Sequence, residues 1–395
     1  MNRLKSPYFW FAFMSSLFVV NALSFSFMLK KDITQDNLQY RILTVNTVDR
    51  TGTVAVVGSQ NARTEYEVII PSSVNSAGVK YSVTQIGEQA FCFNNNLTNV
   101  TIPNCVTHIG GAAFANCTGL TNLIIGKSVT HIGDAAFSLC VNLKTIEVDK
   151  DNQSYASVDG VLLSKDMTSL LAYPSDKAEE KYTIPDGVIH IGNGAFRQCS
   201  RLTSVTLPES VTQIGACSFE KCTNLNHLII GKNVTHIYFR AFHSCNKLKN
   251  VTLPDSVVSI GEGAFAYCNT LTNVIIGKGV TRIEEDTFAA CSLTKITLPD
   301  NVTHIEDYAF AGCRFTDITF PDRVISIGKR AFYSRTDSTA VYFMGPPPKM
   351  GEELIEDLEE RSFDKNAVLY YVEGTPGWTT PTWKGYTTKT WTPEP

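Results

Sequence analysis

A segment of 23 residues recurs along this chain, and no other feature constrains its fold as strongly. Each copy contains an Ala-Phe pair or a close variant, and the Phe recurs at steps of 23, 23, 59, 23, 23, 23, 23, 22 and 22 residues. These residues are Phe91, Phe114, Phe137, Phe196, Phe219, Phe242, Phe265, Phe288, Phe310 and Phe332. A fixed period of this length predicts a solenoid of stacked coils.

Apolar residues occupy the same places in every copy. In the copy LTNVTIPNCVTHIGGAAFANCTG they are Leu97, Val100, Ile102, Val106, Ile109, Ala113, Phe114 and Cys117. Val100 and Ile102 alternate with polar residues, which indicates a short strand with one buried face, and a Pro or Gly then ends it. A single copy cannot bury so many apolar side chains, so the copies must stack.

The same pattern predicts about 11 to 12 short parallel strands, joined by irregular or short helical return segments, in a mainly β protein. The expected strands lie at 68–70, 100–102, 123–125, 146–148, 182–184, 205–207, 228–230, 251–253, 274–276, 296–298, 318–320 and 341–343.

The long step between Phe137 and Phe196 holds 13 residues more than two copies of 23. SYASV and VLLS flank the turn residues Asp159 and Gly160, which is typical of a β-hairpin. We therefore expect a hairpin insert at about 150–178 that projects from the solenoid.

The terminal coils need caps, because they would otherwise expose apolar cross-sections. We assign residues 25–80 to an N-terminal β cap, 81–340 to the solenoid and 341–395 to a C-terminal cap, with a short acidic helix in GEELIEDLEERSF and a strand in AVLYYV. Trp378, Trp383 and Trp391 follow that strand. Packing is the favoured role of these tryptophans, and a ligand platform is the alternative.

The first thirty residues indicate export. Arg3 and Lys5 precede a nearly uncharged stretch, and Ala22 and Ser24 suit a signal-peptidase site, so residues 1–24 are predicted to be a signal peptide. The alternative is an uncleaved signal anchor extending to residue 29, which would be the protein's only contact with a membrane. No cysteine precedes Cys92, which excludes a lipoprotein anchor at the mature N-terminus. We expect the bulk of the chain to be secreted or exposed at the cell surface.

The repeat resembles the BspA-like leucine-rich-repeat family of bacterial and some protist surface proteins. The pattern V-T-[IL]-P-x-[SN]-V-T-x-I-G-x-x-A-F-x-x-C carries the resemblance and reads VTLPDSVVSIGEGAFAYC from Val251 to Cys268. It covers roughly residues 65 to 345, and it implies a leucine-rich-repeat solenoid and a role in adhesion. The chain departs from ordinary leucine-rich repeats because Cys takes the place of the regular Asn ladder.

Cysteine and histidine also recur once per coil. Eight cysteines lie three residues after a repeat Phe: Cys117, Cys140, Cys199, Cys222, Cys245, Cys268, Cys291 and Cys313. One residue per coil gives a ladder rather than the converging pairs of a metal site, so we interpret them as buried thiols. His108, His131, His190, His236 and His304 share a position that Gln, Ser or Arg fills elsewhere, which indicates a solvent-facing polar slot.

No catalytic, metal or cofactor site is expected. Ser, His and Asp occur as repeat positions, and no hydrolase, zinc-protease or phosphate-loop motif interrupts the pattern. A net charge of -4 gives no reason to expect a nucleic-acid partner.

The outward positions of the strands are mostly short and uncharged, with isolated isoleucines. Candidate partner-binding residues are Thr101, Ile124, Thr206, Ile229, Thr252, Ile275 and Thr297 on this face, and Trp378 and Trp383 in the cap. A merely solvated sheet is the alternative for any single residue.

We expect a non-enzymatic binding or adhesion protein that contacts a protein or glycan ligand on host or neighbouring cells. One alternative is a glycan-binding accessory protein of an outer-membrane uptake system, with Trp378, Trp383 and Tyr386 stacking on sugars. A purely structural surface scaffold is the other.

Overall fold

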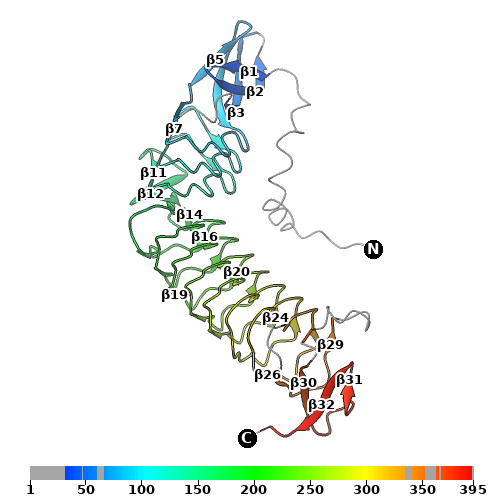
Figure 1. Ribbon diagram of the computed structural model, residues 1–395. Helices are drawn as coiled ribbons and strands as arrows, with labels where there is room; N and C mark the ends of the chain where they lie inside the picture. The colour runs from blue at the N-terminus through cyan, green and yellow to red at the C-terminus, as the bar shows by residue number, and fades with distance from the viewer. Residues whose placement is uncertain are drawn as a thin grey trace.

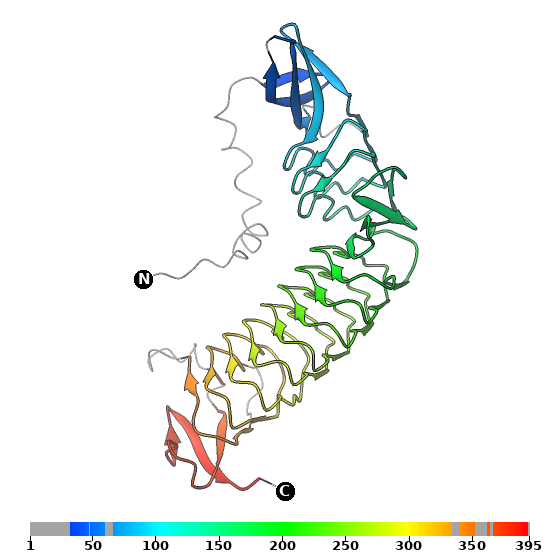
Figure 2. The ribbon, with the colours of Figure 1, turned by 180° about the vertical axis from the view of Figure 1, so that it is seen from behind.

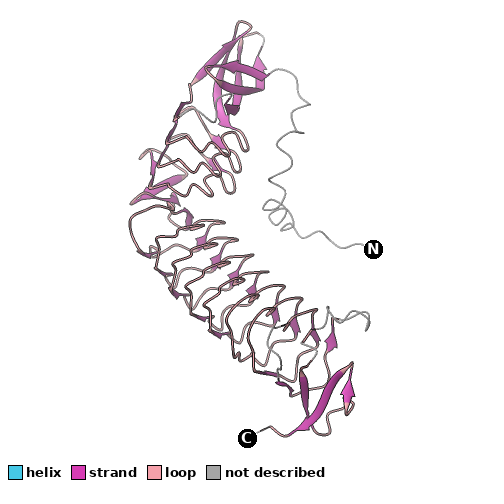
Figure 3. Ribbon diagram, viewed as in Figure 1, coloured by secondary structure: helices cyan, strands magenta, loops and turns pink. Residues whose placement is uncertain are grey.

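The computed structural model describes residues 32–46, 48–59, 66–333, 340–351, 362–363 and 366–393. They form a curved stack of coils that runs as an arc from the N-terminal to the C-terminal strands (Figures 1 and 2). Strands are the only regular secondary structure in these residues (Figure 3), so they contain no helix that could cross a membrane. The predicted signal segment and nearly all of the predicted acidic helix lie outside the described residues.

Each coil contributes a strand of three to six residues to a first row, which we call the outer row. Its members are β4 (Glu67–Ile69), β7 (Asn99–Ile102), β9 (Asn122–Ile125), β11 (Thr145–Val148), β15 (Lys181–Thr183), β17 (Ser204–Thr206), β19 (His227–Ile229), β21 (Asn250–Thr252), β23 (Asn273–Ile275), β26 (Asp317–Phe320), β28 (Ala340–Phe343), β30 (Val368–Val372) and β32 (Tyr386–Trp391). Neighbours within each sheet pair in parallel. The expected strand at 296–298 is present only as a bridge between Thr297 and Ile275.

Mostly two-residue strands of the coils form a second row, which we call the inner row. It contains β6 (Val79–Ile86), β8 (His108–Ile109), β10 (His131–Ile132), β14 (Ser169–Ala172), β16 (His190–Ile191), β18 (Gln213–Ile214), β20 (His236–Ile237), β22 (Ser259–Ile260), β24 (Arg282–Ile283), β25 (His304–Ile305), β27 (Ser326–Ile327) and β29 (Lys349–Met350). In Figure 1, β19 and β26 mark the convex side of the arc, and β16, β20 and β24 lie toward its concave side. The predicted leucine-rich-repeat-type parallel solenoid is thus confirmed.

The return segment around each repeat Phe, which we call the Phe turn, is not helical. In every Phe turn from Phe91 to Phe310 two residues adopt a left-handed backbone, for example Ala112 (φ 51°) and Asn116 (φ 57°). Such residues interrupt a right-handed helix at a cost of about 1–2 kcal/mol each. Hydrogen bonds to the next coil offset this cost: the Phe114 N–H donates to the Ala136 carbonyl at 2.8 Å. The sequence predicted return segments that are irregular or short helices. In the described residues all of them are irregular.

The repeat phenylalanines stack in a column through the core. Phe265 is fully buried, and its ring lies 5.1 Å from that of Phe242 and 5.5 Å from that of Phe288, nearly parallel to both. All eight apolar positions of the first repeat copy are buried, as the pattern predicted. Stacking of the coils therefore buries the apolar side chains that a single coil would leave exposed.

The insert contains β12 (Tyr155–Val158) and β13 (Val161–Ser164), which form the expected antiparallel hairpin, and continues into β14. Asp159 (φ 50°) and Gly160 (φ 77°) both have positive φ, as a tight two-residue hairpin turn requires. The expectation that the insert projects from the solenoid is wrong. Leu163 and Leu170 are buried in the C-terminal part of the core and Leu162 in the N-terminal part, so the insert joins the two.

Strands also cover both ends of the stack. At the N-terminus β1 (Asp32–Gln35), β2 (Leu38–Asn46) and β3 (Thr51–Ser59) form an antiparallel sheet that continues into β6, with β5 (Ser73–Ser76) beside it. At the C-terminus β30 and β32 extend the outer row, and β31 (Thr382–Trp383) pairs with β32. The core is thus covered by hydrogen-bonded strands at each end.

The Phe column yields a stability prediction. Replacing Phe265 with Ala should destabilise the chain by about 3–5 kcal/mol, because it leaves a cavity between two stacked rings. Tyr267→Ala removes an aromatic ring from the same turn that is 54% exposed, and should cost less than about 1 kcal/mol. Urea unfolding followed by circular dichroism measures both variants, and equal destabilisation would contradict the assignment of the column as the core.

Candidate functional site

The candidate residues of the strands form one column along the outer row. Thr101 lies beside Ile124, Thr206 beside Ile229, and Thr252 beside Ile275, which in turn bridges to Thr297. Every one of them is exposed except Thr206, which is half-buried. Their alternation with buried residues on the same strands places them on the surface, as the period-2 pattern indicated.

The sequence reasoning missed one member of this column. Ile69 of β4 lies beside Thr101 and is 80% exposed, more than Ile124 (41%), Ile229 (48%) or Ile275 (55%). The alternation in EVII was the available signal, because Ile69 lies between the apolar residues Val68 and Ile70, which are buried. An exposed isoleucine thus alternates with a threonine along much of the outer row.

The column is interrupted. The insert separates β11 from β15, and the strand pairing stops again between β19 and β21. Near Ile275 and Thr297 a cavity of about 640 Å³ opens beside Lys278 and Lys295. The outer row is therefore a series of short sheets, and the hollow lies where only the bridge between Ile275 and Thr297 continues the pairing.

The tryptophans of the C-terminal cap pack against their surroundings. Trp378 is half-buried, its ring stacks on Tyr371 at 5.3 Å, and its Nε1–H donates to the Gly345 carbonyl at 3.1 Å. Trp383 lies against Trp378 at 4.9 Å and beneath the Lys384 ammonium. Tyr386 is 0% exposed and hydrogen-bonds the Phe363 backbone, so the proposal that it stacks on sugars is wrong.

The cysteine series forms a second ladder between coils. Each of the eight thiols points at the backbone carbonyl of the repeat aromatic residue in the preceding coil, as Cys245 Sγ does to the Phe219 carbonyl at 3.2 Å. All eleven cysteines are free. Burial raises the pKa of the Cys222 thiol to about 12 and that of Cys92 to about 11. All eight ladder thiols are buried, which is consistent with the interpretation as structural groups.

The histidine series lies along the inner row. The rings of His108 and His131 are 5.6 Å apart, and the Thr107 hydroxyl hydrogen-bonds His108 Nδ1 at 2.8 Å. In the described part of the chain no group of three or more His, Cys, Asp or Glu side chains could hold a metal ion. His108 and His131 are exposed, as the polar position predicted, whereas His190, His236 and His304 are half-buried.

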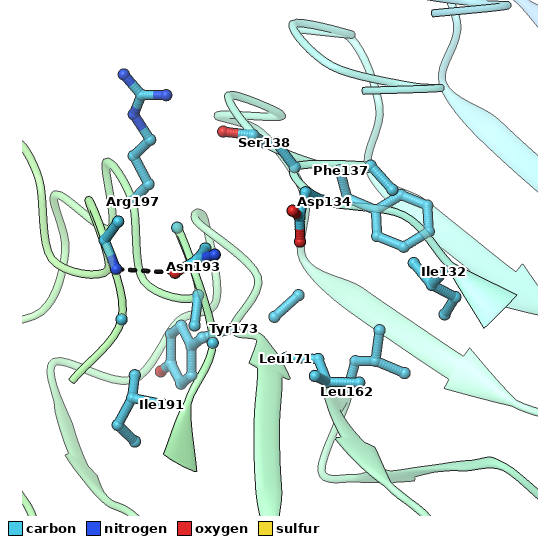
Figure 4. Close-up of a pocket in the computed structure, with 18 of the residues that line it drawn as sticks. Ile132, Asp134, Phe137, Ser138, Leu162, Leu171, Tyr173, Ile191, Asn193 and Arg197 are labelled. Atoms are coloured by element: carbon cyan, nitrogen blue, oxygen red, sulfur yellow. Dashed lines mark hydrogen bonds between the residues drawn. The ribbon is translucent and has the colours of Figure 1, made fainter. Parts of the chain in front are cut away.

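A second cavity, of about 450 Å³, opens where the insert interrupts the coils (Figure 4). Its walls come from the Phe turn of Phe137 on one side and from Tyr173, Asn193 and Arg197 on the other, with Leu162 and Leu171 between them (Figure 4). Arg197 also forms an ion pair with Glu220 at 2.8 Å. Sequence reasoning pointed to the insert but not to a cavity beside it.

Comparisons with known proteins agree with this architecture. A family model described as the BspA type leucine-rich repeat region matches in 6 copies, over residues 70–158, 173–294 and 258–364. A search of curated proteins found no match.

The chain is also similar to solved structures. The pneumococcal vaccine antigen PcpA aligns over 92% of this chain and 99% of its own, at 19% identity and a TM-score of 0.51, which shows the fold alone. A leucine-rich cell surface protein from Faecalibacterium prausnitzii aligns over 85% of this chain and 98% of its own at 26% identity, with a TM-score of 0.44. A leucine-rich-repeat protein from Bacteroides ovatus aligns over 92% and 100% at 25% identity, with a TM-score of 0.46.

The thiol ladder generates a prediction about reactivity. In the native chain only Cys92 and Cys105, which are half-buried, should react with a thiol reagent such as Ellman's reagent, and slowly at neutral pH. Burial raises the pKa of both thiols, so the reactive thiolate is scarce at neutral pH, and the rate should rise about tenfold per pH unit until the pKa is reached. In urea all eleven cysteines should react. Rapid labelling of the ladder cysteines in the native chain would show that they are not buried.

Proposed function

This chain belongs to the BspA-type leucine-rich-repeat family, and from that premise we propose that it is an exported, non-enzymatic binding protein. Its outer row would contact a protein on a host or neighbouring cell. Export rests on the signal-like first thirty residues and on the resemblance to surface proteins. Binding through the outer row rests on the exposed isoleucine column.

The composition of the outer row supports a protein contact. On β7, β9, β17, β19, β21 and β23 the outward residues are Asn, Thr, Ser, His or Ile, with no Lys, Arg, Asp or Glu. Depletion of charge and exposed apolar side chains are typical of the centre of a protein interface. Isoleucines two strands apart lie about 10 Å from each other, so a partner would contact several at once.

Two alternative functions receive less support. A glycan-binding role for the cap tryptophans is disfavoured because Trp378 packs against three aromatic rings and Tyr386 is buried. A purely structural scaffold would not need isoleucines at the surface, although single exposed apolar residues are common in proteins.

The outer row can be tested by adding charge. Ile229→Lys combined with Ile275→Lys should weaken binding to a responding matrix or cell-surface protein by at least about tenfold, or about 1.4 kcal/mol, because each buries an unpaired charge at the contact. Surface plasmon resonance against a panel of immobilised matrix proteins measures the effect. Thermal stability should not change, because both side chains are exposed in the free chain.

The matched control for that pair is Val258→Lys. Val258 is 52% exposed but directly precedes inner strand β22, away from the outer row. It should leave binding unchanged. An equal loss in the control, or none in the double variant, would remove the outer row from the proposal.

Export has its own test. When the full chain is expressed in a bacterium and the exported product is analysed by intact mass, the mature protein should begin at Phe25, because Ala22 and Ser24 fit the peptidase site. Ala22→Arg should block that cleavage and leave a product longer by 24 residues. An exported wild-type product that keeps residues 1–24 would instead establish the anchor.

A further inference from the structure

The Phe turns are joined by a regular set of backbone hydrogen bonds. In nine coils the Phe N–H donates to a carbonyl of the next coil, at Phe91, Phe114, Phe196, Phe219, Phe242, Phe265, Phe288, Phe310 and Phe332. The residues two before and two after the Phe usually do the same: Ala112, Phe114 and Asn116 donate to Asp134, Ala136 and Ser138 at 2.9, 2.8 and 2.8 Å. Every one of these N–H groups points the same way along the stack. A coil without a following turn would therefore present a row of donors.

The coil of Phe137 has no following Phe turn. The insert takes the place of the next Phe turn, so the N–H groups of Ala135, Phe137 and Leu139 have no acceptor among the residues that the structure describes. Ala135 (φ 55°) and Leu139 (φ 64°) keep the left-handed backbone that directs these donors in the other coils. All three residues line the cavity of about 450 Å³.

The side chains of the cavity complement these donors. Ser138 Oγ is buried without a hydrogen-bond partner among the described residues, and Figure 4 shows it pointing across the opening toward Arg197. Leu162, Leu171 and the Phe137 ring provide an apolar floor. The volume falls within the roughly 300–1,000 Å³ of ordinary ligand pockets. Polar groups thus line one edge of this otherwise apolar cavity, which we call the cleft.

The spacing of the donors identifies the kind of ligand. Three N–H groups on alternate residues match carbonyls on alternate residues of another main chain, which is what they contact in the other coils. A small anion would reach only one or two of them. The Asp134 carboxylate on the same wall also opposes an anion (Figure 4). A peptide backbone with small or apolar side chains fits both the donors and the floor.

We propose that this cleft binds a short peptide segment of a partner protein, which completes the interrupted row of hydrogen bonds. The carbonyls of alternate peptide residues accept the N–H groups of Ala135, Phe137 and Leu139, much as a peptide strand adds to a sheet edge. The Ser138 hydroxyl supplies a further hydrogen bond. The cleft is separate from the outer row, because Ile132, Ile191 and Gln213 of the inner row line it. The proposal therefore does not depend on the function assigned to the outer row.

The test uses a peptide copied from the chain itself. Acetylated and amidated GGAAFAN, residues 110–116, contains the carbonyls of Gly111, Ala113 and Ala115, which accept the equivalent N–H groups of the coil of Phe91. It is titrated to millimolar concentration into full-length chain labelled with 15N at Ala, Phe and Leu. The amide signals of Ala135, Phe137 and Leu139 should show the largest shifts, and these should saturate.

A variant pair locates the site. Ser138→Trp fills the cleft and should weaken the peptide's affinity by about tenfold or more. Ala115→Trp places the same side chain one residue after the Phe of an intact coil, and should leave the affinity unchanged. Full affinity in a folded Ser138→Trp variant would overturn the proposal.

Titration of the wild-type chain tests peptide binding to the cleft even if a variant does not fold. Sodium acetate over the same concentration range should leave the three amides unmoved. Shifts with acetate that equal those with the peptide would make the site an anion site and overturn the proposal. The absence of any saturable shift with the peptide would overturn it as well.

Discussion

Hydrogen bonds between coils hold this molecule together, because the strands of a coil and alternate residues of its Phe turn find their backbone partners in neighbouring coils. The N–H groups of every Phe turn except that of Phe137 donate to the next coil, and the ladder thiols donate to the carbonyl of the repeat aromatic residue in the preceding coil. Buried backbone groups need such partners, since an unsatisfied one costs about as much as a lost hydrogen bond. Each coil is therefore stable only between two others, and both ends require the strands that cover them.

The buried positions of the coil could be predicted from the sequence, because burial selects the same apolar residues in every copy. The shape of the Phe turn could not. Its left-handed residues include Ala112, Cys217 and Arg240, which carry no local signal for that backbone. The next coil imposes the conformation, since it supplies the acceptors. For the same reason a helix was a reasonable expectation for the return segment and does not form in the described residues.

The insert and the caps show where a pattern is ambiguous. The sequence VLLS fits a hairpin that projects from the solenoid as well as one that packs into its core. Its leucines are buried because the column of repeat phenylalanines is interrupted after Phe137 and leaves room for them. The tryptophans of the cap likewise fitted both packing and a ligand platform, and the contacts of Trp378 favour packing. The exposure of outward residues such as Ile229 could be predicted from the alternation of apolar and polar residues alone. The cleft could not be predicted, because it depends on which backbone N–H groups have no acceptor in the next coil.

Amide hydrogen exchange across the native chain tests whether the hydrogen bonds between Phe turns stop at the insert. We expect slow exchange at Ala112, Phe114 and Asn116, whose N–H groups are bonded to the next coil, and fast exchange at Ala135, Phe137 and Leu139. Equal protection of the two sets would contradict this expectation, because the row of hydrogen bonds would then continue through the insert.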